Sequence, residues 1–113
     1  MRLLWVENHA RFVAITLQTF LRTRSVRVVP SLAEARLCLA TEPFDAIIID
    51  YDLDDGKGIE LIPLVLSLSN RPLLVAASSH AEGNAQLLKA GVDVVCSKME
   101  FARIEAVLAA ERG

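Results

Sequence analysis

The stretch Ala46-Ile47-Ile48-Ile49-Asp50 is the most informative part of this chain, because an unbroken apolar run ends there at a single carboxylate. Consecutive β-branched residues without polar alternation are typical of a strand that is buried on both faces. Strands of this kind occur in parallel sheets that are covered by helices on both sides. The stretch therefore predicts the central strand of an α/β domain, with Asp50 at its carboxyl end.

Three further apolar runs end in the same way, each at polar residues that can do chemistry. The runs and the residues that end them are Leu3–Val6 with Glu7 and Asn8, Leu73–Ala77 with Ser78, and Val92–Cys96 with Ser97 and Lys98. If all these runs are parallel strands, their carboxyl ends lie along one edge of the sheet, where open α/β folds bind ligands. The polar residues are therefore expected to converge at that edge.

Segments of helical period separate the strand-like runs, and a short run at Val26–Val29 adds another strand. The helical segments are Ala10–Leu21, Ser31–Thr41, Ile59–Leu68, Glu82–Ala90 and Glu100–Glu111. Five βα units thus account for the chain. This alternation predicts a doubly wound, flavodoxin-like α/β fold with five parallel strands in the order 2-1-3-4-5.

Local signals define several boundaries of these elements. Ser31 followed by Glu34 has the spacing of a capping box, which predicts the start of the second helix. Gly91 is expected to close the fourth helix as its C-terminal cap. The acidic segment Asp50–Gly58 is predicted to be a loop from its composition.

Size and composition favour one globular domain over residues 1–113, with no output domain. The chain has 53% hydrophobic residues and a net charge of -2, so neither disorder nor direct binding to nucleic acid is indicated. No stretch has the length of a membrane span or the pattern of a signal peptide, so we expect a cytoplasmic protein without membrane contact. Cys38 and Cys96 are expected to be reduced and buried.

The converging residues predict phosphoryl chemistry. A carboxylate at the mouth of a sheet, with a second acid nearby, can hold Mg²⁺ through oxygen ligands. Asp50 can also attack phosphorus to form an acyl phosphate, while the cation neutralises charge on the transferred group. Lys98 adds a fixed positive charge and Ser78 a hydrogen-bond donor, so these residues with Glu7 predict a pocket of phosphoryl size.

The order of these residues resembles the receiver domain of response regulators in bacterial two-component systems, the CheY-like superfamily, over essentially the whole chain. The resemblance rests on Glu7-Asn8, Asp50, the loop that follows it to Glu60, Ser78, Gly91 and Lys98. It implies that a histidine kinase or phosphotransfer protein donates a phosphoryl group to Asp50 in a phosphorelay, with Mg²⁺ present. Ser78 would then move toward the phosphate, and the domain would signal through a downstream protein or a homodimer.

The sequence departs from the family pattern in ways that bear on the metal and the switch. Asn8 stands where the family usually has an acid that binds the metal directly, so Mg²⁺ affinity is predicted to fall. Asp52, two residues after Asp50, is a candidate to return a carboxylate to the site. Val95 replaces the aromatic switch residue that often precedes the lysine by three positions. The predicted metal ligands are Glu7, Asn8, Asp50 and Asp52.

The hydroxyl assignment is open by one residue. The end of the apolar run favours Ser78, which we adopt, whereas counting from Pro72 favours Ala77, and Ser79 is adjacent.

Two other functions remain open beside the phosphoacceptor switch, which is not an enzyme. A pseudo-receiver would keep the fold and bind a partner without being phosphorylated, and the residues Asn8 and Val95 are consistent with it. A phosphatase-like enzyme would use Asp50 as a transient nucleophile with Asp52 as the partner acid. Against the phosphatase, the chain has no cap insertion to enclose a substrate.

Overall fold

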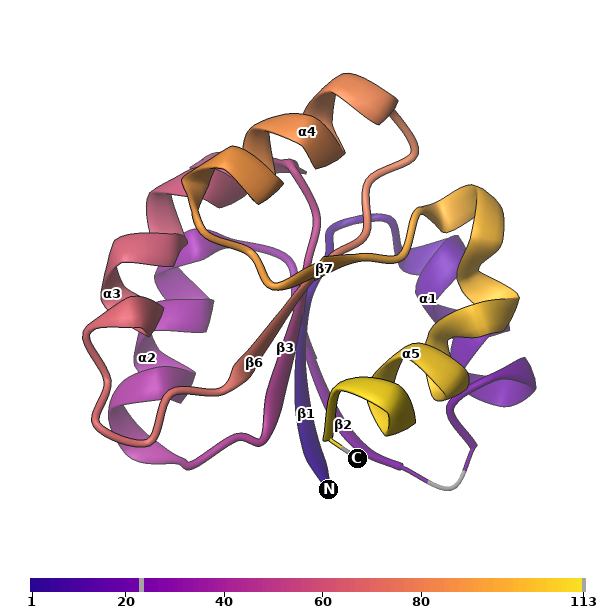
Figure 1. The fold of residues 1–113 in the computed structure, drawn as a ribbon, viewed down its shortest axis with the longest axis horizontal. Coiled ribbons are helices and arrows are strands. Elements are labelled where there is room, and N and C mark those ends of the chain that lie inside the picture. The colour runs from indigo at the N-terminus through magenta and orange to yellow at the C-terminus, as the bar shows by residue number, and fades with distance from the viewer. Residues whose placement is uncertain (23, 113) are drawn as a thin grey trace.

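The computed structural model describes residues 1–22 and 24–112, and it shows a parallel sheet between two layers of helices (Figure 1). The strands of this sheet are β1 (Arg2–Val6), β2 (Ser25–Val29), β3 (Ala46–Ile49), β6 (Leu73–Ala76) and β7 (Val94–Val95). Their order is β2-β1-β3-β6-β7, and all neighbours are parallel. This is the predicted order 2-1-3-4-5, so the predicted fold class is confirmed; positions 23 and 113 of the predicted domain lie outside the described residues.

Helices cover both faces of the sheet. They are α1 (Ala10–Thr19), α2 (Leu32–Thr41), α3 (Ile62–Leu66), α4 (Ala81–Ala90) and α5 (Ile104–Arg112), with 3-10 turns η1 (Gly58–Leu61) and η2 (Lys98–Arg103). Figure 1 shows α2, α3 and α4 on one side and α1 and α5 on the other. The inner strands β1, β3 and β6 are therefore largely shielded from water on both sides, as their apolar composition predicts, whereas the edge strands β2 and β7 are only partly buried.

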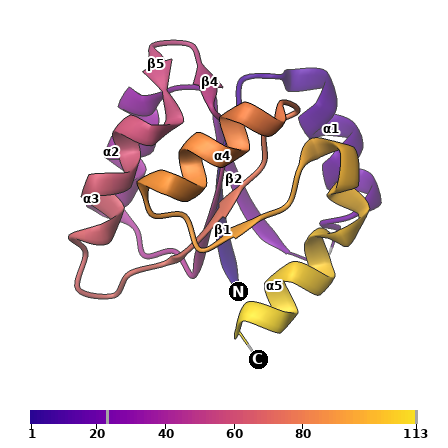
Figure 2. The ribbon, with the colours of Figure 1, turned by 45° about the horizontal axis from the view of Figure 1, so that its top comes forward.

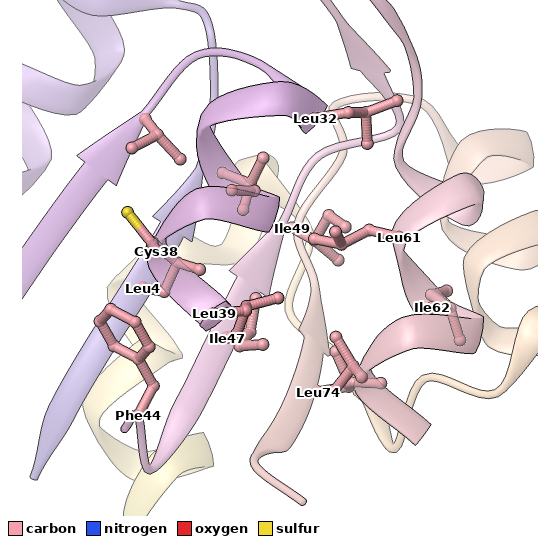
Figure 3. Close-up of a cluster of buried hydrophobic side chains, with 14 of the residues drawn as sticks. Leu4, Leu32, Cys38, Leu39, Phe44, Ile47, Ile49, Leu61, Ile62 and Leu74 are labelled. Atoms are coloured by element: carbon pink, nitrogen blue, oxygen red, sulfur yellow. The ribbon is translucent and has the colours of Figure 1, made fainter. Parts of the chain in front are cut away.

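The sheet separates two apolar cores. On the side of α2 and α3, Ile47 and Ile49 of β3 belong to one buried cluster, and Figure 3 shows Ile49 beside Leu61 of η1. On the side of α1 and α5, Ile48 belongs to a second cluster that includes Trp5 of β1. Because successive side chains of a strand point to opposite faces, β3 serves both cores. This explains why the strand has no polar position before Asp50.

Several helix ends follow the predicted signals. Ser31 is the N-cap of α2, and its hydroxyl accepts a hydrogen bond from the backbone N–H of Glu34 at 3.2 Å. The helix α4 ends at Gly91, whose φ of 125° is a conformation that side chains disfavour. The helix α1 ends at Thr19, two residues earlier than predicted, although Leu21 beyond it is still buried.

Four further predicted segments differ from the structure. The last helix, predicted from Glu100, opens with the 3-10 turn η2 and is α-helical only from Ile104. The segment 59–68 begins with the 3-10 turn η1 and ends as a helix at Leu66. The run 92–96 is a strand only at β7, although backbone hydrogen bonds from Asp93 to Leu74 and from Cys96 to Ala76 continue along β6 on either side. The loop 50–58 contains a hairpin formed by β4 (Asp52–Leu53) and β5 (Gly56–Lys57), which its acidic composition concealed.

Two composition-based expectations bear on the core and on membranes. Cys38 and Cys96 are buried and form no disulfide, as predicted. Within residues 1–22 and 24–112, no helix combines the length and apolar character needed to cross a membrane.

Candidate functional site

The carboxyl ends of β1, β3 and β7 bring Glu7, Asp50 and Lys98 together. Lys98 Nζ donates to Glu7 Oε2 at 2.9 Å and to Asp50 Oδ2 at 3.1 Å. Strand register explains the meeting of the two acids, because Val6 pairs with Ile49 across β1 and β3. The residues that follow this pair therefore leave the sheet side by side.

This ion cluster of Glu7, Asp50 and Lys98 is shielded from water. The exposed fractions of the three side chains are 0%, 8% and 13%, respectively. With little water to screen them, the charges interact more strongly than surface charges do. The cluster has one more carboxylate than it has ammonium groups, so its charge favours the approach of a further cation.

Glu7 has one carboxylate oxygen without a hydrogen-bond partner. Its Oε2 accepts from Lys98 and from the backbone N–H of His9 at 3.2 Å, whereas Oε1 is buried and unpaired among the described residues. Burial raises the pKa of the Glu7 carboxyl to about 7; the hydrogen bond from Lys98 opposes this rise, and the charge of Asp50 adds to it. A buried, unpaired carboxylate oxygen is a ligand that a hard cation accepts.

Aromatic rings flank the lysine of the ion cluster. Lys98 Nζ lies 5.4 Å from the ring centre of Phe12 in α1. Phe12 packs edge-on against Trp5 at 5.9 Å and against Phe101 of η2 at 5.5 Å. Trp5 and Phe101 stack with ring centres 5.3 Å apart. This aromatic wall restricts the lysine side chain and attracts its charge through the face of the Phe12 ring.

Ser78 follows β6 and is bound to the start of α4. Its backbone N–H donates to Asn84 Oδ1 at 2.8 Å, and Asn84 Nδ2 donates to the Ser78 carbonyl at 3.0 Å. The hydroxyl accepts from the backbone N–H of His80 at 3.2 Å, and a Cβ on Gly83 would lie 2.9 Å from it. The switch role predicted for Ser78 therefore stays a prediction, because these contacts hold the hydroxyl against α4.

Ala77 is the residue on the Asp50 side of the sheet. It belongs to the same buried cluster as Ile48. Ile48 precedes Asp50 by two positions, and residues two apart in a strand point to the same face of the sheet. Ser78 has the opposite parity, and Ser79 is exposed. Of the three candidates for the hydroxyl position, the one that lies on the side of Asp50 has no hydroxyl.

The two remaining predicted metal ligands lie near the β4–β5 hairpin. Asn8 is exposed, and its Nδ2 donates to Asp54 Oδ1 at 3.1 Å. Asp52 is also exposed, and its carboxylate forms an ion pair with Lys57 in the facing strand. The metal-binding role predicted for Asp52 stays a prediction.

The oxygen atoms of the site suit a magnesium ion that keeps several of its water ligands. Within the part of the chain that the structure describes, no three His, Cys, Asp or Glu side chains group closely enough to hold a metal ion. Glu7 and Asp50 supply two carboxylates, and Asn8 supplies an amide oxygen. Mg²⁺ is usually bound through one or two carboxylates while it keeps several waters, so these ligands fit Mg²⁺. Their total negative charge is smaller than in the family pattern, because Asn8 is neutral.

Comparison with known proteins decides the fold family. No family model matches the sequence. Response regulator protein PilR of Pseudomonas aeruginosa is 32% identical over 92 residues, which cover 79% of this chain, and the chain spans 20% of that relative's length. The receiver domain of a sensor histidine kinase from Pseudomonas aeruginosa, with a magnesium ion coordinated in its active site cleft, matches with a TM-score of 0.84. The chain has the fold of a response regulator receiver domain.

The structural match extends over nearly the whole chain. The histidine kinase receiver domain is 21% identical, with 96% of this chain and 94% of that chain covered. A response regulator from Burkholderia pseudomallei, with a phosphorylated aspartic acid, calcium ion and citrate, is 25% identical and has a TM-score of 0.79. That match covers 96% of this chain and 65% of the other.

Within this receiver fold, the predicted site residues separate into two groups. Glu7, Asp50 and Lys98 meet in one buried cluster, as the strand ends indicated. Ser78 contacts α4 instead, and Asp52 pairs on the hairpin. The strand-end pattern thus located the acids and the lysine of the site, but it did not determine the direction of the hydroxyl.

Sequence reasoning missed two residues that contact the site. Phe12 lies in the helical segment Ala10–Leu21, and nothing in the sequence distinguishes it from a core residue. Asp54 lies in the acidic segment Asp50–Gly58, which is predicted to be a loop. The turn-forming dipeptide Asp55-Gly56 beside it was a signal for the hairpin that carries it.

Proposed function

We propose that Asp50 accepts a phosphoryl group from a histidine kinase or a phosphotransfer protein, as the receiver of a two-component phosphorelay. The observation that supports this function is the buried contact of Asp50 Oδ2 with Lys98 Nζ at 3.1 Å, at the carboxyl edge of a receiver fold. A carboxylate in this position can attack phosphorus, and a fixed ammonium beside it stabilises the charge of the transferred group.

The step is a transfer from nitrogen to oxygen. An Asp50 oxygen attacks the phosphorus of a phosphohistidine, the phosphorus–nitrogen bond breaks, and an acyl phosphate forms on Asp50. Oδ1 accepts a hydrogen bond from the backbone N–H of Tyr51 at 2.8 Å, which fixes the carboxylate for attack. The side chains of Glu7, Asn8 and Asp50 are proposed to hold Mg²⁺ together with the backbone carbonyl of Asp52, because the Asp52 carboxylate is paired with Lys57. When bound, the ion would neutralise charge on the phosphoryl group.

The proposed output is a change in protein contacts. Phosphorylation adds a charge of about -1.5 to -2, which draws Lys98 toward the phosphate and alters its contact with Glu7. The ammonium group of Lys98 packs on the ring of Phe12 in α1, and Lys98 itself begins η2 after β7. A displacement of the lysine side chain therefore affects the surfaces of α1 and of the β7–η2 segment. We propose that a downstream protein or a second copy of the chain recognises this difference.

Mass spectrometry tests the function directly. The parent protein and Asp50→Asn are incubated with acetyl phosphate and Mg²⁺, and the mass of the intact protein is measured. We expect a phosphoryl adduct in the parent and none in the variant. An adduct on both proteins would place the phosphate elsewhere and contradict the proposal.

A pseudo-receiver is the second candidate, and the absence of a hydroxyl at Ala77 favours it. In the switch that the resemblance implies, a hydroxyl moves toward the phosphate after phosphorylation, and the residue on the Asp50 side of the sheet has no hydroxyl. The same experiment separates the candidates. If no adduct forms under conditions that label an authentic receiver, the unmodified surface is the functional one.

A further inference from the structure

The amide of Asn8 has a defined orientation. Its Nδ2 donates to Asp54 Oδ1 at 3.1 Å. A carboxylate accepts hydrogen bonds but has none to donate, so the amide must present its nitrogen to Asp54. The carbonyl oxygen of Asn8, which has no hydrogen bond from the described residues, is thereby left to bind a cation.

Asp54 is itself held in place by the hairpin. The neighbouring Asp55 accepts hydrogen bonds from the backbone N–H groups of Leu32 at 2.7 Å and Ala33 at 3.0 Å. These groups open α2, and Figure 2 shows β4 and β5 beside the start of that helix. The backbone N–H of Asp54 also donates to the Pro30 carbonyl at 3.4 Å. The backbone of Asp54 is therefore held beside the start of α2, while its exposed carboxylate contacts Asn8.

The other end of the hairpin is equally constrained. The backbone N–H of Lys57 donates to Glu60 Oε2 at 2.8 Å. A Cβ on Gly56 would lie 2.5 Å from that same oxygen and 2.8 Å from Leu32 Cδ1, so the hairpin packs closely on η1 and α2. Both strands are thus fixed on the body of the domain, which preorganises the carboxylate of Asp54 beside Asn8.

We propose that Asp54 is a positioning residue for the divalent cation of this receiver. It holds the nitrogen of the Asn8 amide and so leaves the carbonyl oxygen for the cation, and it restores near the site the negative charge that Asn8 lacks. The inference rests on the proposed function, because the cation is the one that the phosphoacceptor site takes. Outer carboxylates that orient a ligand in this way commonly change metal affinity by about 10- to 100-fold.

Asp52 is the matched control. It lies on the same hairpin, is exposed, and is paired with Lys57, whose Nζ also lies 5.2 Å from the ring centre of Tyr51. Asp52→Asn removes the same charge as Asp54→Asn without touching Asn8. A difference between the two variants therefore reports the contact with Asn8 rather than the net charge of the hairpin.

Isothermal titration calorimetry with Mg²⁺ alone is the first experiment. We expect Asp54→Asn to raise the Mg²⁺ dissociation constant by about tenfold and Asp52→Asn by less than about twofold. Circular dichroism confirms that each variant is folded. Equal dissociation constants for the parent and Asp54→Asn would overturn the proposal, and so would a larger effect of Asp52→Asn.

A double-mutant cycle separates positioning from direct ligation. In an Asn8→Ala background there is no amide to orient, so we expect the effect of Asp54→Asn to shrink to that of Asp52→Asn. If the full tenfold effect persisted, Asp54 would act without Asn8, which would overturn its positioning role.

Phosphorylation of the same variants is measured separately, by intact-protein mass spectrometry after incubation with acetyl phosphate and Mg²⁺. A parent protein that binds no Mg²⁺ would overturn the role of Asp54, whatever happens at Asp50. A parent that binds Mg²⁺ but forms no adduct would contradict phosphotransfer alone. Labelling of Asp50 together with an unchanged Mg²⁺ affinity in Asp54→Asn would overturn only the present inference.

Discussion

Two groups of acidic residues lie close together in this receiver fold and are held in opposite ways. Glu7 and Asp50 are buried and share a single ammonium group, that of Lys98. The acids of the β4–β5 hairpin are exposed, and each has its own partner: a lysine, an amide or the start of a helix. The buried acids therefore depend on one another, whereas each hairpin acid can be changed with little effect on the next.

The difference between the two groups shows that burial determines how strongly a carboxylate interacts with its neighbours. Buried charges are poorly screened, so removing one partner leaves an uncompensated charge and changes both chemistry and stability. Exposed ion pairs contribute little to stability but can orient a side chain or a loop. We therefore assign reactivity to the buried cluster and geometry to the hairpin.

The largest expected effect comes from removing the shared ammonium. Lys98→Met should lower the free energy of unfolding by about 3 kcal/mol at a pH above the raised Glu7 pKa of about 7, because two buried carboxylates lose the one cation that pairs with them among the described residues. Chemical denaturation followed by circular dichroism measures it. Lys57→Met, which breaks the exposed pair with Asp52, is the control and should show no measurable change. Equal losses in the two variants would remove the contrast between the two groups.

A pH series without metal sharpens the contrast further. The pKa of Glu7 is raised from 4.5 to about 7, so the folded state binds its proton more tightly than the unfolded state. Its stabilisation is complete below pH 4.5 and is lost as the pH rises through 7, a fall of about 3 kcal/mol. Glu7→Gln should lack this fall. Unfolding of the parent and the variant at several pH values measures it, and parallel curves would show that Glu7 titrates normally.

The smallest effect is expected on the hairpin. The hydrogen bond from the Leu32 backbone N–H, followed by that from Ala33, lowers the pKa of Asp55. Asp55→Asn should speed hydrogen exchange of those two amides several-fold while global unfolding stays unchanged. Nuclear magnetic resonance exchange measurements test it, with Asp52→Asn as the variant that leaves both amides protected. Loss of global stability in Asp55→Asn would show that the hairpin is part of the cooperative core.

The predictable parts of the fold were those that local chemistry determines. The run Ala46–Ile49 has no polar position, and it is the strand that serves both cores. Ser31 and Glu34 predicted the start of α2 to the residue. The length of β7 was harder to predict, because Val92–Cys96 is apolar almost throughout, yet only Val94 and Val95 form a regular strand. Apolar composition alone does not show how far a strand stays in register with its neighbour.

The site was predictable only to the level of strand ends. That Glu7, Asp50 and Lys98 meet follows from parallel strands, but the direction of each side chain depends on strand parity and rotamers. Ser78 illustrates this limit, since a shift of one residue exchanges the two faces of the sheet. The contact between Asn8 and Asp54 joins residues 46 positions apart through a hairpin, and no local pattern encodes it.

The aromatic wall also provides an internal optical probe. Trp5 is the single tryptophan of the chain, and it stacks on Phe101. It also contacts Phe12, whose ring in turn contacts the ammonium group of Lys98. Its fluorescence therefore arises from one known place, two residues before Glu7. Emission intensity and wavelength will report any movement of η2 away from β1, so the state of the site can be followed in real time without an added dye.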